Sequence, residues 1–267
     1  MKRVLIACEY SGRVREALRA KGVDAWSCDI LPSDDNSDYH IQKDLKEVLK
    51  DEWFAIIAFP PCTHLAVSGA RHFHKKQKEQ KESLEFVQMI FDYDCEYLCI
   101  ENPVSIISSK IKKPSQYIQP YEFGHAMSKK TCLWLRNLPK LEGTDNVYDR
   151  VEWENYDSGK RMCKWYSHDK KNRDKTFQNI ANAIADQWSK YLKNDIRKLK
   201  DIFDQAINHY CLIDQCYYYD EIKLTELYMQ FLNCDYIEAV EFIYHNIICY
   251  KNNKNYPKVI EYGEYNE

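Results

Sequence analysis

The informative stretch is Trp53-Phe54-Ala55-Ile56-Ile57-Ala58-Phe59-Pro60-Pro61-Cys62, an apolar run that ends in two prolines and a cysteine. A second apolar run, Tyr97-Leu98-Cys99-Ile100, ends in Glu101-Asn102-Pro103-Val104. Short apolar runs of this kind indicate buried strands, and open α/β sheets bind ligands at the carboxyl ends of their strands. The two runs therefore predict that a cysteine and a carboxylate face each other at one edge of a sheet.

Strands and helices alternate on both sides of this stretch. Strands are expected at Val4–Ala7, Ala25–Cys28, Trp53–Ala58, Tyr97–Ile100 and Thr131–Leu135, and helices at Ser11–Ala20, Lys81–Ile90 and Phe177–Leu192. This alternation indicates βαβ units, so we predict an α/β fold with a doubly wound, mostly parallel sheet over residues 1–192. Residues 193–267 have apolar side chains at helical spacing, which predicts a small helical appendage.

The composition is that of an ordinary soluble globular protein, with 45% hydrophobic and 30% charged residues among 267. No apolar run is long enough to span a bilayer and the N-terminus does not resemble a signal peptide, so a cytoplasmic protein is expected. The eleven cysteines include no Cys-x-x-Cys pair and are expected to be free thiols. The spacing of Cys62, His64, His72 and His74 fits no structural zinc pattern, and no metal is expected.

Charge is distributed unevenly along the chain. Residues 195–267 carry 7 Lys and Arg against 13 Asp and Glu, whereas Lys and Arg cluster at 71–81, 110–113, 129–140 and 160–175. The first two clusters follow the cysteine and glutamate runs, where they would attract a phosphate backbone. The acidic C-terminal segment is instead expected to pack on the catalytic domain or on another subunit, unless it is only a helical cap.

Each reactive residue also has a structural interpretation. A free cysteine after an apolar strand is usually a small buried hydrophobe, and a carboxylate at a strand end often caps the next turn. The two prolines favour the functional interpretation, because each fixes its φ angle and lacks an N–H group. The loop that carries Cys62 is therefore expected to be rigid, which suits a nucleophile.

These motifs resemble those of a known enzyme family. Pro60-Pro61-Cys62 and Glu101-Asn102-Pro103-Val104 resemble the Pro-Cys and Glu-Asn-Val motifs of DNA cytosine-5 methyltransferases. The segments at 5–18 and 25–30 are similar to that family's first cofactor motif and to the acidic residue that ends its next strand. The amino-acid sequence of residues 60–71 is also similar to that of compact, phage-type members of this family. The resemblance covers residues 1–192. Within them, the strand and helix pattern loosens over about 104–175, and this region is expected to contact the substrate.

The resemblance implies S-adenosylmethionine as the cofactor. Ser11 and Gly12, at the start of the first expected helix, offer free N–H groups to a small carboxylate. Asp29 is the implied ligand of the ribose, although turn formation before Pro32 explains it equally well from the residues alone. The full implied set of cofactor residues is Glu9, Ser11, Gly12, Asp29, Ile30 as an adenine wall, Asp44 and Leu45 at the adenine amine, Pro60 beneath the cofactor, and Asn179.

The resemblance also implies the chemistry. The Cys62 thiolate adds to C6 of a cytosine that has been flipped out of DNA, and Glu101 hydrogen-bonds N3 and the exocyclic amine. The sequence departs from the family pattern at two places. Thr63 follows the cysteine where the family has glutamine, and the segment Ser128-Lys129-Lys130-Thr131 lacks the family's substrate-contacting arginine. Lys129, or else Lys130, is expected to replace that arginine.

Two alternatives remain open at this stage. The same site could act on a cytidine nucleotide or on RNA instead of DNA. The chain could also be a catalytically silent α/β module that binds nucleic acid or a nucleotide, because a fold does not establish an activity.

Overall fold

The structure is a computed structural model that describes residues 2–157, 159, 161–164 and 175–193. Its seven-stranded sheet has the order β3-β2-β1-β4-β5-β7-β6. The strands are β1 (Val4–Ala7), β2 (Ala25–Asp29), β3 (His40–Gln42), β4 (Ala55–Ala58), β5 (Tyr97–Pro103), β6 (Gln116–Ile118) and β7 (Thr131–Arg136). A separate hairpin consists of β8 (Trp153–Asn155) and β9 (Arg161–Cys163).

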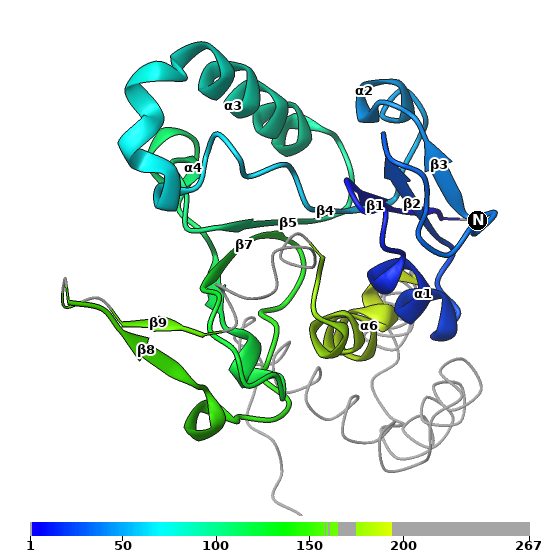
Figure 1. Cartoon of the computed structure of the whole chain (residues 1–267). Coiled ribbons are helices and arrows are strands. Elements are labelled where there is room, and N and C mark those ends of the chain that lie inside the picture. Colours follow the sequence, from blue (N-terminus) through cyan, green and yellow to red (C-terminus); the bar gives the residue numbers. More distant parts are fainter. Residues whose placement is uncertain (1, 158, 160, 165–174, 194–267) are drawn as a thin grey trace, which may run out of the picture. The chain divides into compact units, whose positions relative to one another are not determined.

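Helices cover both faces of the sheet (Figure 1). They are α1 (Arg13–Ala20), α2 (Leu45–Val48), α3 (Gln77–Asp92), α4 (Ile107–Lys110) and α6 (Gln178–Leu192), with 3-10 helices η1 (Val67–Lys75), η2 (Pro120–Glu122) and η3 (Tyr148–Arg150). In Figure 1, α1 and α6 lie together below the sheet, and α2, α3 and α4 lie above it. The predicted mostly parallel α/β sheet is confirmed.

Two hydrophobic cores separate these layers. The lower core joins α1 and α6 to one face of the strands through side chains such as Ile6, Leu18, Ile57 and Trp188. The upper core packs α3 and α4 on the other face. It includes Leu5, Ile56, Ile90, Ile100 and Trp134. Successive residues of β1 and β4 thus point into different cores, which is why both strands are continuously apolar.

The sheet is mixed because of one strand. β1 to β5 pair in parallel, whereas β7 lies between β5 and β6 and is antiparallel to both. Pairing with β7 extends β5 to Pro103, with Glu101 opposite Leu133 and Pro103 opposite Thr131. The predicted end of this strand at Ile100 was therefore too early, and Glu101 lies inside the strand.

The first helix contains an unexpected buried residue. Val14 and Leu18 are buried, as expected for apolar side chains, but Arg15 is also fully buried, whereas Ala17 is only partly so. The Arg15 guanidinium donates to Glu16 Oε1 (2.8 Å), to Ser27 Oγ (2.7 Å) and to Asp35. Hydrogen bonds and two carboxylates thus compensate for the burial of its charge.

The predictions for residues 193–267 concern a segment that, apart from Lys193, lies outside the described residues. The helical appendage and its packing therefore stay predictions. Within the ranges that the structure describes, no helix is both long enough and apolar enough to cross a membrane.

Candidate functional site

The sheet has a switch point between β1 and β4. From β1 the chain builds outward through β2 and β3, and it then crosses to the other side of β1 to form β4 and β5. A doubly wound sheet binds ligands at such a point, outside the carboxyl ends of the strands. Figure 1 shows these ends on the left, where η1 and α4 follow β4 and β5.

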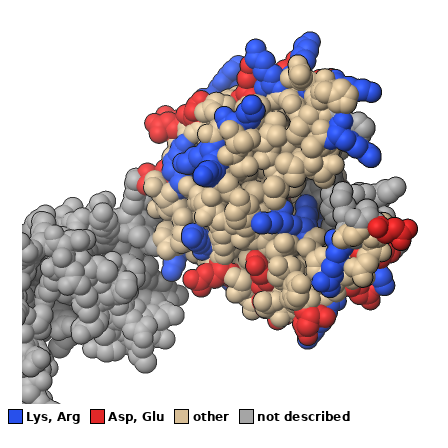
Figure 2. Space-filling model, turned by 90° about the vertical axis from the view of Figure 1, so that its left-hand side faces the viewer, with Lys and Arg blue, Asp and Glu red and all other residues tan. Residues whose placement is uncertain are grey.

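Basic side chains lie across this side of the molecule. Figure 2 looks onto it and shows Lys and Arg over its centre and upper part, with Asp and Glu mainly towards the upper left and the lower edge. A surface of this kind attracts an anionic ligand.

The Cys62 loop forms a compact turn directly after β4. The Cys62 carbonyl accepts hydrogen bonds from the backbone N–H groups of Leu65 (3.0 Å) and Ala66 (2.9 Å). Pro60 is buried, and Cys62 is partly exposed. The turn holds the cysteine backbone at the switch point and leaves its side chain accessible from solvent.

The end of β5 holds this turn in place. The Asn102 side chain, 1% exposed, donates through Nδ2 to the Pro60 carbonyl at 2.8 Å. The backbones also join, because Val67 N–H donates to Val104 O and Ile106 N–H to Leu65 O, each at 3.0 Å. The two motifs singled out from the sequence are therefore neighbours in space, and Asn102 is the residue that connects them.

A pocket opens beside this junction, between the sheet and α6. Glu101, Lys129 and Lys175 supply its charged groups. The remaining lining is mainly apolar: Ile57, Phe59, Cys99, Ile118, Thr131, Leu133, Leu141, Thr176, Phe177, Ile180 and Ile184. Cys62 is not among the lining residues, so the pocket brings together two of the three predicted catalytic residues and the third stands on the adjacent loop.

The surroundings of Glu101 favour its protonated form. Burial raises the pKa of the Glu101 carboxyl above its ordinary value, whereas the positive charge of Lys129 and a hydrogen bond from Thr131 oppose that rise. A carboxyl group with a raised pKa can keep a proton near neutral pH and donate it in a hydrogen bond. This is the form required to hydrogen-bond a ring nitrogen that lacks a proton.

The structure distinguishes Lys129 from Lys130. Lys129 lines the pocket with Thr131 and Leu133, whereas Lys130 is exposed and its ammonium lies 4.4 Å from the centre of the Tyr117 ring. Side chains of a strand and its extension alternate between faces, which explains why neighbouring lysines differ in environment. Of the two candidates, Lys129 is the one at the pocket.

The loop between β1 and α1 is organised by Glu9. Its buried carboxylate accepts from the backbone N–H of Val14 (2.7 Å) and of Arg15 (3.3 Å), and Ser11 Oγ lies 3.5 Å from Oε1. Gly12 has φ +69°, and a Cβ atom there would collide with the Arg15 guanidinium and Asp35. Glu9 thus caps α1, and the positive φ angle and the close contacts at position 12 favour glycine there.

The end of β2 presents the side chains expected near adenosine. Asp29 Oδ1 accepts from the Leu31 N–H at 2.9 Å, which is the turn interpretation of this residue. Ile30 is 72% exposed, an unusual position for a large apolar side chain. Asp44 accepts from Lys46 N–H at 2.8 Å and caps α2, while Leu45 is buried beneath it.

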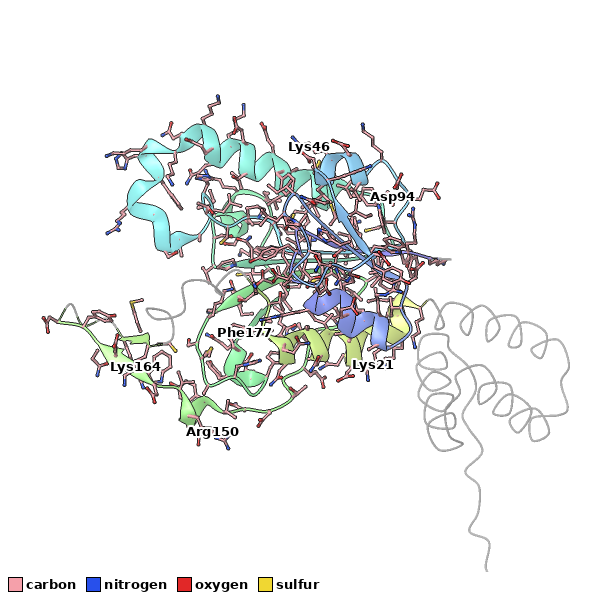
Figure 3. All side chains as sticks on the ribbon, turned by 45° about the vertical axis from the view of Figure 1, so that its right-hand side comes forward. Lys21, Lys46, Asp94, Arg150, Lys164 and Phe177 are labelled. Atoms are coloured by element: carbon pink, nitrogen blue, oxygen red, sulfur yellow. The ribbon has the colours of Figure 1, made fainter. Side chains whose placement is uncertain are left out.

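Lys175 and Thr176 were not named as site residues from the sequence, and Phe177 was expected only to begin the last helix motif. Lys175 Nζ forms an ion pair with Asp34 Oδ2 at 2.7 Å, and Arg13 donates to the Thr176 carbonyl at 2.7 Å. Phe177, labelled at the start of α6 in Figure 3, lines the pocket and contacts the ring of His125. These contacts link distant segments, so only the folded structure reveals them.

Asn179 connects α6 to the turn after η2. Its Nδ2 donates to the Phe123 carbonyl at 2.8 Å, and its backbone N–H donates to His125 Nε2 at 3.3 Å. Burial and the nearby Arg13 lower the pKa of His125, which keeps the ring neutral and able to accept this hydrogen bond. Asn179 therefore fixes the start of α6 beside the pocket.

No cluster of three or more His, Cys, Asp or Glu side chains that could hold a metal ion is present in the described part of the chain.

Comparison with known proteins adds a distant likeness. No protein-family model matches the chain, and no curated protein matches its sequence. Among solved structures, one that is similar is an E. coli protein named as a DNA modification methyltransferase encoded within a prophage. The match has a TM-score of 0.33 and 12% sequence identity, and it covers 51% of this chain and 46% of that one. The matched region thus spans less than half of the other protein.

Proposed function

We propose that the protein is an S-adenosylmethionine-dependent DNA cytosine-5 methyltransferase that uses Cys62 as a covalent nucleophile. The observation that carries this proposal is the contact between Asn102 and Pro60, which places the Cys62 loop against the strand that bears Glu101. A nucleophile and a carboxyl group that favours protonation are the two groups that addition to a cytosine ring needs.

The end of β2 and the switch point fit the cofactor. Asp29 offers a carboxylate for the ribose hydroxyls, and the exposed Ile30 offers an apolar wall for adenine. The N–H groups of Ser11 and Gly12, which precede α1, would receive the carboxylate of the methionine end. Glu9, Asp44 and Leu45 would act indirectly, because the first two cap helices and the third is buried. When bound, S-adenosylmethionine supplies an electrophilic methyl group.

Cys62 performs the first step in the proposed mechanism. Its thiolate attacks C6 of cytosine, forming an S–C6 bond and moving the electrons of the C5–C6 double bond onto C5 and the N3 side of the ring. C5 is then nucleophilic enough to accept the methyl group. Removal of the C5 proton by a base restores the double bond and expels the thiolate, so Cys62 is regenerated.

Glu101 and Lys129 handle the charge that develops on the ring. The protonated Glu101 carboxyl donates to N3, and its second oxygen accepts from the exocyclic amine, a pattern that favours cytosine over uracil. Lys129 supplies a positive charge on the same side, where it can hydrogen-bond the ring carbonyl at position 2. The raised pKa of Glu101 is consistent with this donor role.

Nucleoside mass spectrometry tests the activity. Purified protein is incubated with S-adenosylmethionine and either duplex DNA, RNA or cytidine nucleotides, and 5-methylcytosine is quantified in each. We expect methylation of DNA alone. Methylation only of RNA or nucleotides would reassign the substrate, and no product from protein that binds the cofactor would refute the activity.

A mechanism-based trap tests the nucleophile. DNA containing 5-fluorocytosine should form a covalent adduct, because fluorine at C5 cannot leave as a proton does. Cys62→Ala should form no adduct. Cys95→Ala is the control and should form the adduct normally, because Cys95 is a buried thiol just before the start of β5, at the end of the strand away from Glu101. An adduct that persists in Cys62→Ala would identify a different nucleophile.

A further inference from the structure

The segment after β5 forms a basic surface that the proposed reaction does not use. It contains Lys110 at the end of α4, Lys112 and Lys113 before β6, Tyr117 on β6 and Lys130 before β7. All five side chains are exposed, and Tyr117 is 49% exposed despite its size. We call these five residues the basic strip.

The strip is not neutralised by nearby acidic groups. No Asp or Glu occurs in the sequence between Glu101 and Glu122, or between Glu122 and Glu142. None of the four strip lysines forms an ion pair within the part of the chain that the structure describes. By contrast, Lys78 and Lys81 on α3 pair with Glu82 and Glu85 at 3.9 and 3.8 Å.

The strip begins close to the Cys62 loop. The backbone bonds Val67 N–H to Val104 O and Ile106 N–H to Leu65 O join that loop to the chain immediately before α4. Lys110 lies four residues beyond Ile106. A polyanion bound along the strip would therefore pass next to the loop that carries the nucleophile.

One end of the strip also offers an aromatic platform. Lys130 lies 4.4 Å from the centre of the Tyr117 ring, on the edge strand of the sheet. Aromatic rings beside cations stack on nucleobases and hold phosphates in nucleic-acid-binding proteins. Exposed lysines on an edge strand can also serve only to prevent aggregation, so this alternative needs a separate test.

We infer that the basic strip binds the phosphodiester backbone of duplex DNA beside the extruded cytosine. This inference rests on the proposed function for the identity of the nucleic acid. The inferred binding surface is formed by residues that follow β5 in the sequence and is separate from the pocket. Lys130, one of the two candidates to replace the family's arginine, is thereby assigned to DNA binding and not to the reaction itself.

The test compares two triple variants of the full chain. The strip variant is Lys110→Gln, Lys112→Gln and Lys113→Gln. The control is Lys21→Gln, Lys140→Gln and Lys190→Gln, which removes the same charge from exposed lysines. Lys21 follows α1, and Lys140 follows β7, which runs antiparallel to β5. Both lysines therefore lie towards the amino ends of the parallel strands, away from the Cys62 loop at their carboxyl ends. Figure 3 labels Lys21 beside α1.

Duplex binding is measured by fluorescence anisotropy from 50 to 200 mM salt. The strip variant should bind roughly 10-fold or more weakly, with a slope of log affinity against log salt that is lower by about 2 to 3, because each lost phosphate contact removes about 0.9 from the slope. The control should match the wild type. Equal binding by the strip variant and the control would overturn the inference, as would tighter binding of duplex RNA than of DNA through the strip.

Two further measurements separate this inference from its alternatives. Tyr117→Ala and Lys130→Gln, made singly, should each weaken DNA binding while the protein stays monodisperse in size-exclusion chromatography. Aggregation with unchanged affinity of the remaining monomer would assign the strip to edge protection and refute its binding role. A wild type that binds DNA through the strip but forms no 5-methylcytosine would refute the proposed function and leave the strip standing.

Discussion

At the scale of single residues, environment decides what each charged group can do. Glu9 and Glu101 both have a pKa raised by burial, yet Glu9 is held by the N-terminus of a helix and Glu101 faces a pocket with Lys129. Arg15 is buried and donates to Glu16, Ser27 and Asp35. Arg13, two positions earlier, is partly exposed, and its side chain donates to the Thr176 carbonyl. The two glutamates therefore differ in that Glu9 is bonded to the backbone of α1, whereas Glu101 is placed where the proposed reaction needs a carboxyl group.

Glu101 makes the activity depend on pH in a defined direction. Because its pKa is raised and the protonated form is the donor in the proposed mechanism, methyl transfer should fall as the pH rises through that pKa. Glu101→Gln should lose roughly 100-fold or more in single-turnover rate and should lack this limb of the pH profile. Lys129→Met should move the limb to higher pH, since Lys129 lowers the pKa of Glu101. A limb that stays in Glu101→Gln would belong to another group.

Arg15 should dominate the stability of its surroundings. Arg15→Met removes the cation that pairs with Asp35 and the hydrogen bond that Arg15 donates to Ser27 Oγ, so the free energy of unfolding should fall by about 3 kcal/mol. Urea denaturation measures this change. The neighbouring Arg13→Met is the matched control and should lose about 1 kcal/mol or less, because one hydrogen bond of a partly exposed side chain is removed. Equal losses would contradict the role given to burial.

At the scale of elements, the sequence predicted the long apolar strands and the strongly periodic helices. The positions of β1, β4 and α6 agree with expectation to within two residues, because the apolar residues of these elements follow a clear strand or helix pattern. The three-residue strands β3 and β6 were missed, since they take their form from neighbours that are distant in sequence. The roles of Lys175 and Arg15 were missed for the same reason, since their partners are distant in sequence. The proximity of the Cys62 and Glu101 runs could be predicted, because both runs end consecutive strands of a βαβ unit.

Glu9 links the start of α1 to pH. Burial raises its pKa from 4.5 to about 7, so the folded state binds this proton more tightly than the unfolded state does. The stability that this group contributes is complete below pH 4.5 and is lost as the pH rises through 7, by up to about 3 kcal/mol. The difference in unfolding free energy between wild type and Glu9→Gln should therefore change across this range. A constant difference would show that the backbone N–H groups hold the pKa at its ordinary value.

Asn102 should control the Cys62 loop. Asn102→Asp keeps the size of the side chain but loses the donor to Pro60, which should cost about 1 to 3 kcal/mol and slow formation of the 5-fluorocytosine adduct. Cofactor affinity, measured by calorimetry, should change less than the adduct rate, because the substitution removes a hydrogen bond to the Pro60 carbonyl and leaves the Pro60 ring, the group expected beneath the cofactor, unchanged. Normal adduct formation in a destabilised variant would limit Asn102 to a purely structural role.

At the scale of the whole molecule, the described residues already contain every group of the proposed site. The sheet, the pocket and the basic strip all lie within residues 2–193. The segment at 195–267 is acidic, and its charge disfavours phosphate binding.

Truncation after Lys193 should therefore preserve the function. The shortened protein should bind S-adenosylmethionine and form the covalent adduct, with any loss appearing in thermal stability or in oligomeric state. Calorimetry and analytical ultracentrifugation measure these properties. A truncated protein that binds the cofactor but has lost all affinity for DNA would show that the C-terminal segment contacts nucleic acid.

The position of β7 has a consequence for how the chain is made. The ribosome releases β6 before β7, yet β7 is the strand that joins β6 to β5. Until residue 136 has emerged, the growing chain therefore exposes the open hydrogen-bonding edge of β5, and Glu101 has no neighbour on that side. Unpaired strand edges of this kind recruit other chains. Translation that stalls between residues 118 and 136 would consequently leave a nascent protein prone to association, with its Cys62 loop already made and the pocket around Glu101 still incomplete.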